Sequence, residues 1–494
     1  MKIPLELVNF LKDHAQNIGH SLIKRSRKLN LSDELFEKVL VGDIRSEEEA
    51  ADLFYGVWDH RYRELRGRFI DALTTSLLMI DFKGKDLPVH SKEHYRLMRE
   101  VLAAKILQGQ TQQKSAIFFA ERCYKRGKEL HLYDIVRDAI IILKNYYGTK
   151  AIKAKEYDAY YKEWRAVENI LKQEQHAHHL YASMLLHYKK NSHRVVECIE
   201  KYQAYVNQLI PFLSCPSLRF QLFTRLIRMN VFGIQYDFQG MLDCTNEDID
   251  YFGSMNPVPN TYYFLSLLQK VGACQRLGMY EEALDTIRVA QRTVNDRSLN
   301  YFTLKYQSFF IRMQTGGYEQ ARTIYEQVIR HKRYKTFPAY LLEEWEVGGA
   351  YLRLIEEMGL LTARSKPTFK LAKFLNSVPE YSKDKRVKHV PIYIVHILFF
   401  LLRSKRGELI DRIDRIEQYC AKHLRYNEAI RSNAFIKALL EIPKRSFHAV
   451  AVERHAKKYL DKMKSVDPHE NGKRLDLEII PYETLWQYAM KLIS

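Results

Sequence analysis

The sequence predicts an all-α fold: a solenoid of stacked helical hairpins with a small helical unit at the N-terminus. The 494 residues include only 20 Gly and 13 Pro, whereas average usage gives these two types about 12% of positions. The interval 149–210 contains neither. Strand-rich folds need frequent turn residues, so this scarcity favours long helices with short joints. In addition, one segment occurs twice, as GMYEEALDTIRVA at 278–290 and as GGYEQARTIYEQV at 316–328.

Residues 1–90 are predicted to form the N-terminal helical unit. Ser46 followed by Glu49 is a capping box, which marks the start of a helix. A longer amphipathic helix is expected after it, because apolar residues recur every four positions. These positions are Leu65, Phe69, Leu73 and Leu77. Gly84 and Pro88 are expected to end this helix.

The rest of the chain is predicted to form three helical regions, at 91–245, 246–360 and 361–494. The first contains a hairpin at 115–148 with its joint near Gly127. We predict a long loop from Cys244 to Tyr263, because this stretch contains Gly and two Pro. The longest apolar run, 390–402, is shorter than the ~20 residues that a membrane helix needs. It is therefore predicted to be a buried core helix, with no membrane insertion.

The two copies of the repeated segment place similar residues at the same positions. The matched pairs are Gly278 and Gly316, Tyr280 and Tyr318, Ala283 and Ala321, Ile287 and Tyr325, and Ala290 and Val328. A glycine suits a tight turn between antiparallel helices, and a small alanine lets the second helix approach the first. Larger residues further along fill the groove between hairpins. Because one hairpin cannot bury its own apolar face, such units stack.

This G-x-Y-x-x-A pattern resembles the tetratricopeptide repeat. The resemblance is specific over about 260–330, and the 38-residue period is slightly longer than the ~34 of that family. A weaker third copy places Trp345 and Gly349 at the family's Trp and Gly positions. Cys274 and Arg312 depart from the pattern, because the family usually has Tyr there.

The resemblance implies a right-handed superhelix of helix pairs whose concave face binds a peptide or a helix of a partner protein. First-helix positions would line that face. Transferred to this sequence, they are Leu268, Gln275, Arg276, Tyr306, Phe310, Met313 and Gln314. The alternative is that several of these residues, the apolar ones above all, pack against adjoining repeats.

The charge of the chain suggests a second class of function. The net charge is +19, and residues 301–494 hold 35 Lys and Arg against 22 Asp and Glu. Basic clusters occur at 331–335, 383–389 and 403–407, and such clusters attract nucleic acid or other polyanions. Residues 46–73 also resemble a helix-turn-helix, with Gly56 at the turn. The nucleic-acid-binding residues in this alternative are Arg61, Arg63, Arg66 and Arg68.

The sequence offers little to support an enzyme. It contains none of the common phosphate-binding, zinc-protease or hydrolase motifs. The cluster EQHAHH contains Glu174, His176, His178 and His179, but no second ligand set accompanies it. The six Cys are isolated and form no CxxC pair, which fits the reducing cytoplasm. We therefore expect a non-enzymatic cytoplasmic scaffold or adaptor with no metal and no cofactor.

Overall fold

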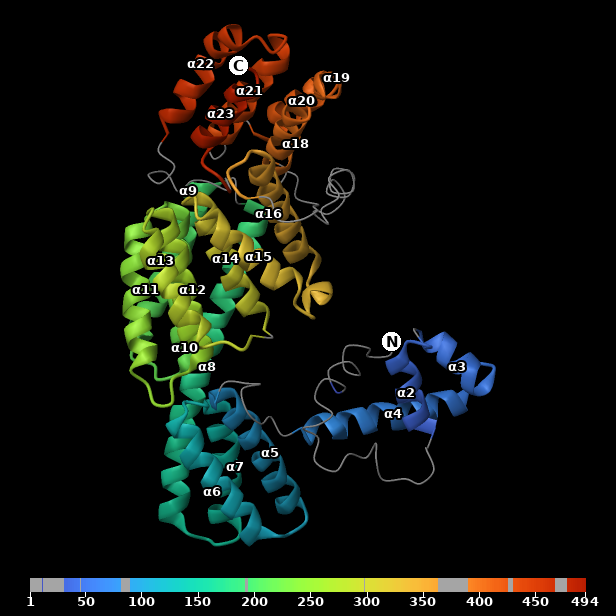
Figure 1. Cartoon of the computed structure of the whole chain (residues 1–494). Helices are drawn as coiled ribbons and strands as arrows, with labels where there is room; N and C mark the ends of the chain where they lie inside the picture. The colour runs from blue at the N-terminus through green and yellow to red at the C-terminus, as the bar shows by residue number, and fades with distance from the viewer. Residues whose placement is uncertain are drawn as a thin grey trace. The chain divides into compact units, whose positions relative to one another are not determined.

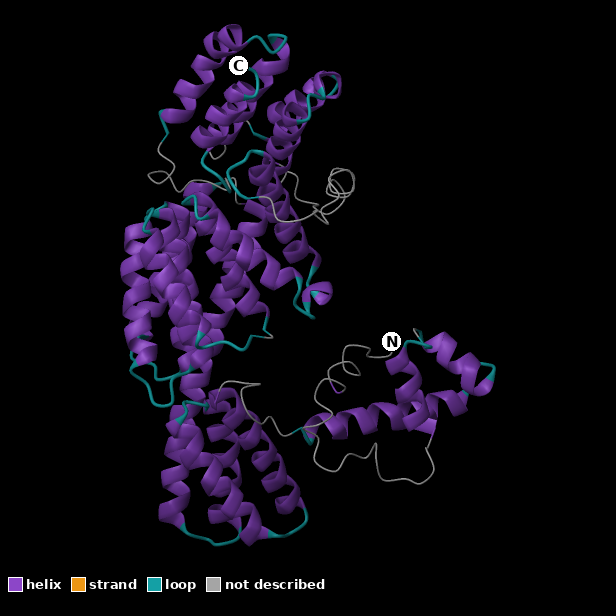
Figure 2. Ribbon diagram, in the orientation of Figure 1, coloured by secondary structure: helices purple, strands orange, loops and turns teal. Residues whose placement is uncertain are grey.

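The computed structural model describes residues 11, 31–44, 46–80, 89–191, 194–296, 298–362, 390–424, 430–466 and 478–494. Every regular element within these ranges is a helix, as Figure 2 shows. The predicted all-α class is therefore confirmed. The chain divides into two compact units, residues 1–167 and 168–494. The boundary lies inside the long helix α8 (Ala154–Asn191), and the predicted division into four regions stays a prediction.

Three helices near the N-terminus share a small apolar core. They are α2 (Leu31–Val41), α3 (Glu47–Tyr55) and α4 (His60–Leu78), and both α2 and α3 pack against α4 (Figure 1). The capping box is confirmed, because the Ser46 hydroxyl accepts a hydrogen bond of 3.1 Å from the Glu49 amide. Gly56 ends α3 with a left-handed φ of 72°, and the Asp59 carboxylate caps the start of α4.

The predicted apolar face of α4 is correct for three of its four residues. Leu65, Phe69 and Leu73 are buried, whereas Leu77 is exposed and Ser76 faces the core instead. Each four-residue step turns about 40° too far around a helix of 3.6 residues per turn. After three such steps the side chain has left the buried face.

Three antiparallel helices follow in the same unit: α5 (Val89–Gly109), α6 (Gln113–Glu129) and α7 (Tyr133–Thr149). The predicted hairpin is confirmed, but its turn comes a few residues after Gly127 and has His131 in the left-handed conformation, at φ 55°. Gly127 itself is a close-approach site. A Cβ there would lie 2.9 Å from a methyl carbon of Val136 in α7.

The second unit continues with helices that pack mainly on their neighbours in the sequence. The first of these are α9 (Val195–Leu209), α10 (Leu218–Gln235), α11 (Phe238–Gly253), α12 (Asn260–Arg276), α13 (Tyr280–Gln291), α14 (Leu299–Gln314), α15 (Tyr318–Ile329) and α16 (Ala339–Glu357). The predicted loop from Cys244 to Tyr263 is too long, because α11 continues to Gly253 and α12 begins at Asn260, which leaves residues 254–259 as the loop. Cys244, Thr245 and Asp248 are buried in that helix, and this packing outweighs its turn-like composition.

The helices of the C-terminal region are α18 (Val390–Leu402), α19 (Arg406–Ile410), α20 (Ile413–His423), α21 (Ile430–Lys444), α22 (Ala449–Lys464) and α23 (Tyr482–Lys491). Helix α18 is almost wholly buried, so the prediction of a core helix at 390–402 is confirmed. Among the described residues, none of the helices is long and apolar enough to cross a membrane. The basic cluster 383–389 lies outside the described residues.

One type of turn ends many of these helices. The N–H of a residue two or three positions after the helix bonds the carbonyl five residues back, and the residue just before the donor adopts a positive φ. In the repeats, Met279 N bonds Cys274 O at 2.8 Å and Gly317 N bonds Arg312 O at 2.7 Å. The residue with positive φ is glycine at some of these turns and a residue with a side chain at the rest. The residues with positive φ are Gly42, Thr111, His131, Tyr236, Gly278, Gly316, Gly359, Ser404 and Ser446.

The matched residues of the two repeats have the same structural roles. Gly278 and Gly316 have φ values of 72° and 77°, and both Ala283 and Ala321 are fully buried. The two hairpins predicted within about 260–330 are thus confirmed as the helix pairs α12–α13 and α14–α15.

In the third copy that the sequence suggests, α16 would be the first helix, and the residues of the second helix lie outside the described ones. Trp345 is fully buried in this helix. A Cβ on Gly348 would lie 2.8 Å from the Phe309 ring, and one on Gly349 would lie within 3.0 Å of three atoms of Tyr325. The two glycines therefore let α16 approach the second hairpin closely. The turn of this copy lies at Gly359.

The turn geometry predicts opposite effects for two substitutions. Gly316→Ala should lower the free energy of unfolding by about 1 kcal/mol, because an L-residue at positive φ is strained. Ser404→Gly should raise it by about 1 kcal/mol, because Ser404 (φ 52°) is relieved of that strain. Urea denaturation followed by circular dichroism measures both. Gly67→Ala, in the open interior of α4, is the control and should stabilise. An unchanged Gly316→Ala variant would contradict the backbone explanation.

Candidate interaction surfaces

The predicted first-helix residues of α12 are half-buried. Leu268 packs at the edge of the apolar cluster of α11–α14, and the Arg276 guanidinium lies 5.9 Å from the centre of the Phe238 ring. Gln275 is half-buried, and its amide nitrogen is buried with no hydrogen-bond partner among the described residues. Each of the three residues still presents part of its surface to solvent, so a partner can reach α12.

The predicted residues of α14 lie mostly inside the protein. Tyr306 and Met313 are buried in the core that α14 forms with α16, and the Tyr306 ring centre lies 5.5 Å from that of Trp345. These two side chains are therefore packing residues, which corrects their assignment to a partner-binding face. The cause is the close approach of α16. Phe310 keeps part of its surface exposed.

Gln314 contacts the C-terminal segment of the same chain. Its amide donates a hydrogen bond of 3.0 Å to the carbonyl of Glu478. Ile479 and Ile480, which follow Glu478, are buried in the core that contains Met313. This part of the predicted face is occupied by the protein's own residues, and the binding role of the half-buried Gln314 stays a prediction.

A buried ion-pair network holds this C-terminal segment. The Arg431 guanidinium, 1% exposed, lies 2.6 Å from a Glu478 carboxylate oxygen and 2.8 Å from one of Glu483. It also donates hydrogen bonds of 3.2 Å to the carbonyls of Met463 and Val466. All the charges in the network are therefore paired, as buried charges must be.

The four N-terminal arginines are not a uniform basic face. Arg61 pairs with Asp59 at 2.7 Å and Arg66 pairs with Glu47 at 3.0 Å. Arg63 and Arg68 are exposed, and no described carboxylate lies within 4.0 Å of either. Residues 31–80 contain 11 acidic and 6 basic residues. This surplus of negative charge opposes the attraction of a polyanion to α4.

A more favourable basic surface lies on α22, which sequence analysis missed. Its exposed basic residues are Arg454, Lys457, Lys458, Lys462 and Lys464. None of them has a carboxylate within 4.0 Å among the described residues. By contrast, within the predicted cluster 403–407, Arg403 pairs with Glu357 at 2.8 Å and Lys405 with Glu408 at 2.6 Å. The four-residue spacing of Arg454, Lys458 and Lys462 is the feature of the sequence that could have indicated this basic surface.

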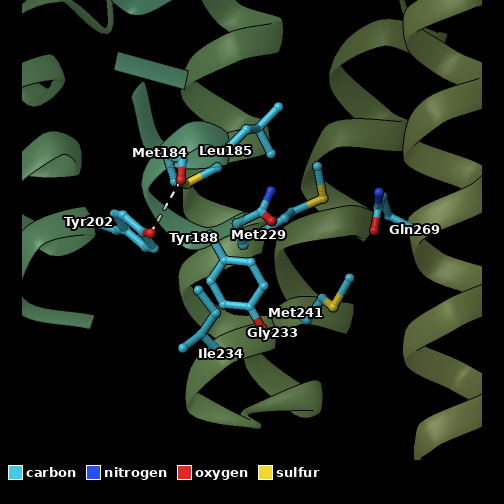
Figure 3. Close-up of a pocket in the computed structure, with 10 residues that line it drawn as sticks. Met184, Leu185, Tyr188, Tyr202, Met229, Gly233, Ile234, Met241 and Gln269 are labelled. Atoms are coloured by element: carbon cyan, nitrogen blue, oxygen red, sulfur yellow. Dashed lines mark hydrogen bonds between the residues drawn. The ribbon is translucent and has the colours of Figure 1, made fainter. Parts of the chain in front are cut away.

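A pocket of about 240 Å³ opens among helices α8 to α12 of the second unit (Figure 3). Helix α8 contributes Met184, Leu185 and Tyr188, and the Met229 and Met241 thioethers come from α10 and α11. The walls are therefore mainly apolar. None of the predicted binding residues lines it.

Tyr202 of α9 forms one wall of the pocket with its ring. Its hydroxyl donates to the Met184 carbonyl at 3.2 Å and lies 3.0 Å from Nδ1 of His187. The hydroxyl is thus satisfied within the protein. Asn230 of α10 and Gln269 of α12 supply the amide groups of the pocket.

Burial lowers the reactivity of four of the six cysteine thiols. Burial raises the pKa of the Cys123 and Cys420 thiols to about 12 and that of Cys244 and Cys274 to about 11. Thiols with a raised pKa are poor nucleophiles. The described part of the chain contains no group of three His, Cys, Asp or Glu that could hold a metal ion. In the EQHAHH cluster, Glu174 is buried and accepts a hydrogen bond of 2.7 Å from Ser217.

Comparison with known proteins identifies no relative: no family model, curated protein or solved structure matches the chain.

His396 is the most strongly perturbed histidine of the described residues. It lies in α18 with 7% of its surface exposed, and its Nε2 has no hydrogen-bond partner among the described residues. Burial, together with Arg412 and Arg415, lowers its pKa to about 4. The folded protein therefore keeps this imidazole neutral in mild acid.

This burial predicts a loss of stability in acid. Between pH 6.5 and 4 the unfolded chain binds a proton at His396 that the folded chain does not, so stability falls as the pH falls. The loss at pH 4 is roughly 3 kcal/mol. Urea denaturation at pH 7 and pH 4 measures it, and His396→Leu should remove most of the difference. His176→Leu, at an exposed position, is the control. If the His396→Leu variant lost as much stability between pH 7 and pH 4 as the unsubstituted protein, the attribution of the acid sensitivity to His396 would be contradicted.

Proposed function

We propose that the protein is a non-enzymatic interaction module, in which a tetratricopeptide-like stack of helical hairpins holds a peptide or helix of a partner protein. The observation that carries this proposal is the pair of hairpins α12–α13 and α14–α15, which share the turn geometry at Gly278 and Gly316 and a fully buried alanine in the second helix. A repeated joint of this kind stacks helix pairs in register. The family that these repeats resemble uses such stacks to bind peptides.

The residues that remain accessible favour the α12 part of the stack as the contact surface. Leu268, Gln275 and Arg276 supply an apolar side chain, an amide and a cation on one helix. The packing of α16 and the C-terminal segment closes most of α14 to a partner. Among the apolar residues predicted on α14, Phe310 keeps part of its surface exposed to a partner. A contact of this composition suits an amphipathic peptide with an acidic residue.

The capture of a partner should depend on α12 and not on the second helix of the hairpin. Leu268→Ala combined with Arg276→Ala is expected to reduce the captured partner at least tenfold, because both contacts are lost. Affinity capture of the full chain from its native host, with identification by mass spectrometry, measures this. The matched control is Val289→Ala with Arg288→Ala on α13, where both residues are exposed. Equal loss in both variants, or in neither, would exclude α12 as the contact surface.

A second candidate function is the binding of nucleic acid through the basic face of α22. The observation that favours it is the set of lysines and the arginine without nearby carboxylates on this helix. Arg454, Lys458 and Lys462 recur every four residues and therefore share one face. Such a face can follow a row of phosphates, in line with the positive charge of the C-terminal region.

Salt dependence tests this candidate. Lys457→Ala, Lys458→Ala and Lys462→Ala together should weaken binding to labelled duplex DNA or RNA. The slope of log affinity against log salt should become shallower by about 2 to 3, one unit for each lost phosphate contact. Fluorescence anisotropy at low and moderate salt measures the affinity and its salt dependence. The variant with Arg63→Ala and Arg68→Ala is the control, and it should change neither the affinity nor the slope. An absence of binding at low salt would remove this candidate.

A further inference from the structure

We infer that the pocket among helices α8 to α12 is a specificity site that accepts one large apolar side chain, aromatic or branched, from a bound peptide. This inference rests on the proposed function, because it assumes a peptide partner. It adds what that proposal leaves open, which is the kind of residue that the partner must present. The pocket residues are those of Figure 3, and none of them belongs to the predicted α12 and α14 set.

The volume of the pocket matches a single side chain. At about 240 Å³ it is smaller than the roughly 300–1,000 Å³ typical of sites for drug-sized ligands. It is larger than a cavity of about 150 Å³ that holds benzene. One aromatic ring or branched aliphatic chain with its methylene therefore fits, whereas a nucleotide or an extended cofactor does not.

The lining favours an apolar and variable occupant. Met184, Met229 and Met241 contribute three flexible thioethers, which adapt to side chains of different shape and make favourable contacts with aromatic rings. Tyr202 also lines the pocket, and its hydroxyl is already bonded to the Met184 carbonyl and to His187. A charged side chain would find no opposite charge among the residues that line the pocket.

The amide groups of the pocket favour a peptide over a free hydrocarbon. Asn230 donates through its Nδ2 to the Leu226 carbonyl at 2.7 Å, which leaves its Oδ1 as an acceptor. Gln269 has no hydrogen-bond partner among the described residues, so its amide can both donate and accept. A peptide backbone offers one N–H and one C=O per residue and can satisfy these groups. Leu185, 46% exposed, adds apolar surface that a longer peptide would cover.

One of the residues that line the pocket, at position 233 of α10, is glycine. A Cβ on Gly233 would meet no atom within 4 Å, so the missing side chain leaves open space. Gly233 lies inside a helix, where glycine is unfavourable by about 1 kcal/mol relative to alanine. Larger residues at this position should therefore fill the pocket without straining the backbone. Gly272 of α12 is equally open but does not line the pocket, which makes it a matched control.

Blocked amino acids test the site directly. N-acetyl-phenylalanine amide should bind the full chain saturably in an NMR titration, and N-acetyl-alanine amide at least tenfold more weakly, because it lacks the ring. Gly233→Leu should abolish binding of the phenylalanine compound, Gly233→Ala should weaken it only in part, and Gly272→Leu should leave it unchanged. The graded series separates pocket filling from a general effect on the helix. Circular dichroism of each variant checks the fold.

Three results would overturn the inference. The first is that N-acetyl-phenylalanine amide fails to bind saturably. The second is that the Gly233→Leu variant binds this compound as well as the unsubstituted protein does. The third is that toluene binds as tightly as the phenylalanine compound, which would make the pocket a site for free apolar molecules. The capture experiment separates these failures from that of the proposed function. A partner that is lost with Leu268→Ala and Arg276→Ala but retained with Gly233→Leu would support the module and exclude this pocket. Binding of the blocked phenylalanine without any captured partner would support the pocket as a binding site and count against the interaction module.

Discussion

The fold depends on tight turns that reverse the chain within a few residues after many of its helices. The N–H group that bonds the carbonyl five residues back satisfies one of the orphan acceptors at the helix end, and a single left-handed residue directs the chain into the next helix. With such a short joint, consecutive helices lie antiparallel and pack their apolar sides on one another. The burial of Ala283 and Ala321, and of Trp345 on the next helix, follows from that reversal.

This constraint explains how far the fold could be predicted from the sequence. At Gly278 and Gly316 the left-handed residue is glycine, so the joint is visible as a repeated motif. At Thr111, His131 and Ser404 the same geometry is adopted by residues that rarely have a positive φ. There the packing of the paired helices offsets the local strain, and no local signal marks the turn. The same dominance of packing extends α11 through residues whose composition suggested a loop.

The interaction surfaces were predicted less well, because they depend on contacts between residues far apart in the sequence. The repeat pattern correctly places Tyr306 and Met313 on the first helix of a hairpin. It cannot show that α16 packs over them, or that Glu478, 164 residues beyond Gln314, supplies the partner of its amide. The pocket has no sequence motif, since its residues come from five helices. Its one local signal is Gly233, a glycine inside a helix.

The C-terminal segment also limits where a partner can bind. Arg431 holds Glu478 and Glu483 in a buried network, and breaking such a network by removing one member costs about 3–5 kcal/mol. A partner that displaced this segment from α14 would have to offset that loss and expose Ile479 and Ile480. Contact at α12 and the α8–α12 pocket requires no such rearrangement. The intramolecular packing of the C-terminal segment therefore favours recognition at the earlier helices of the second unit.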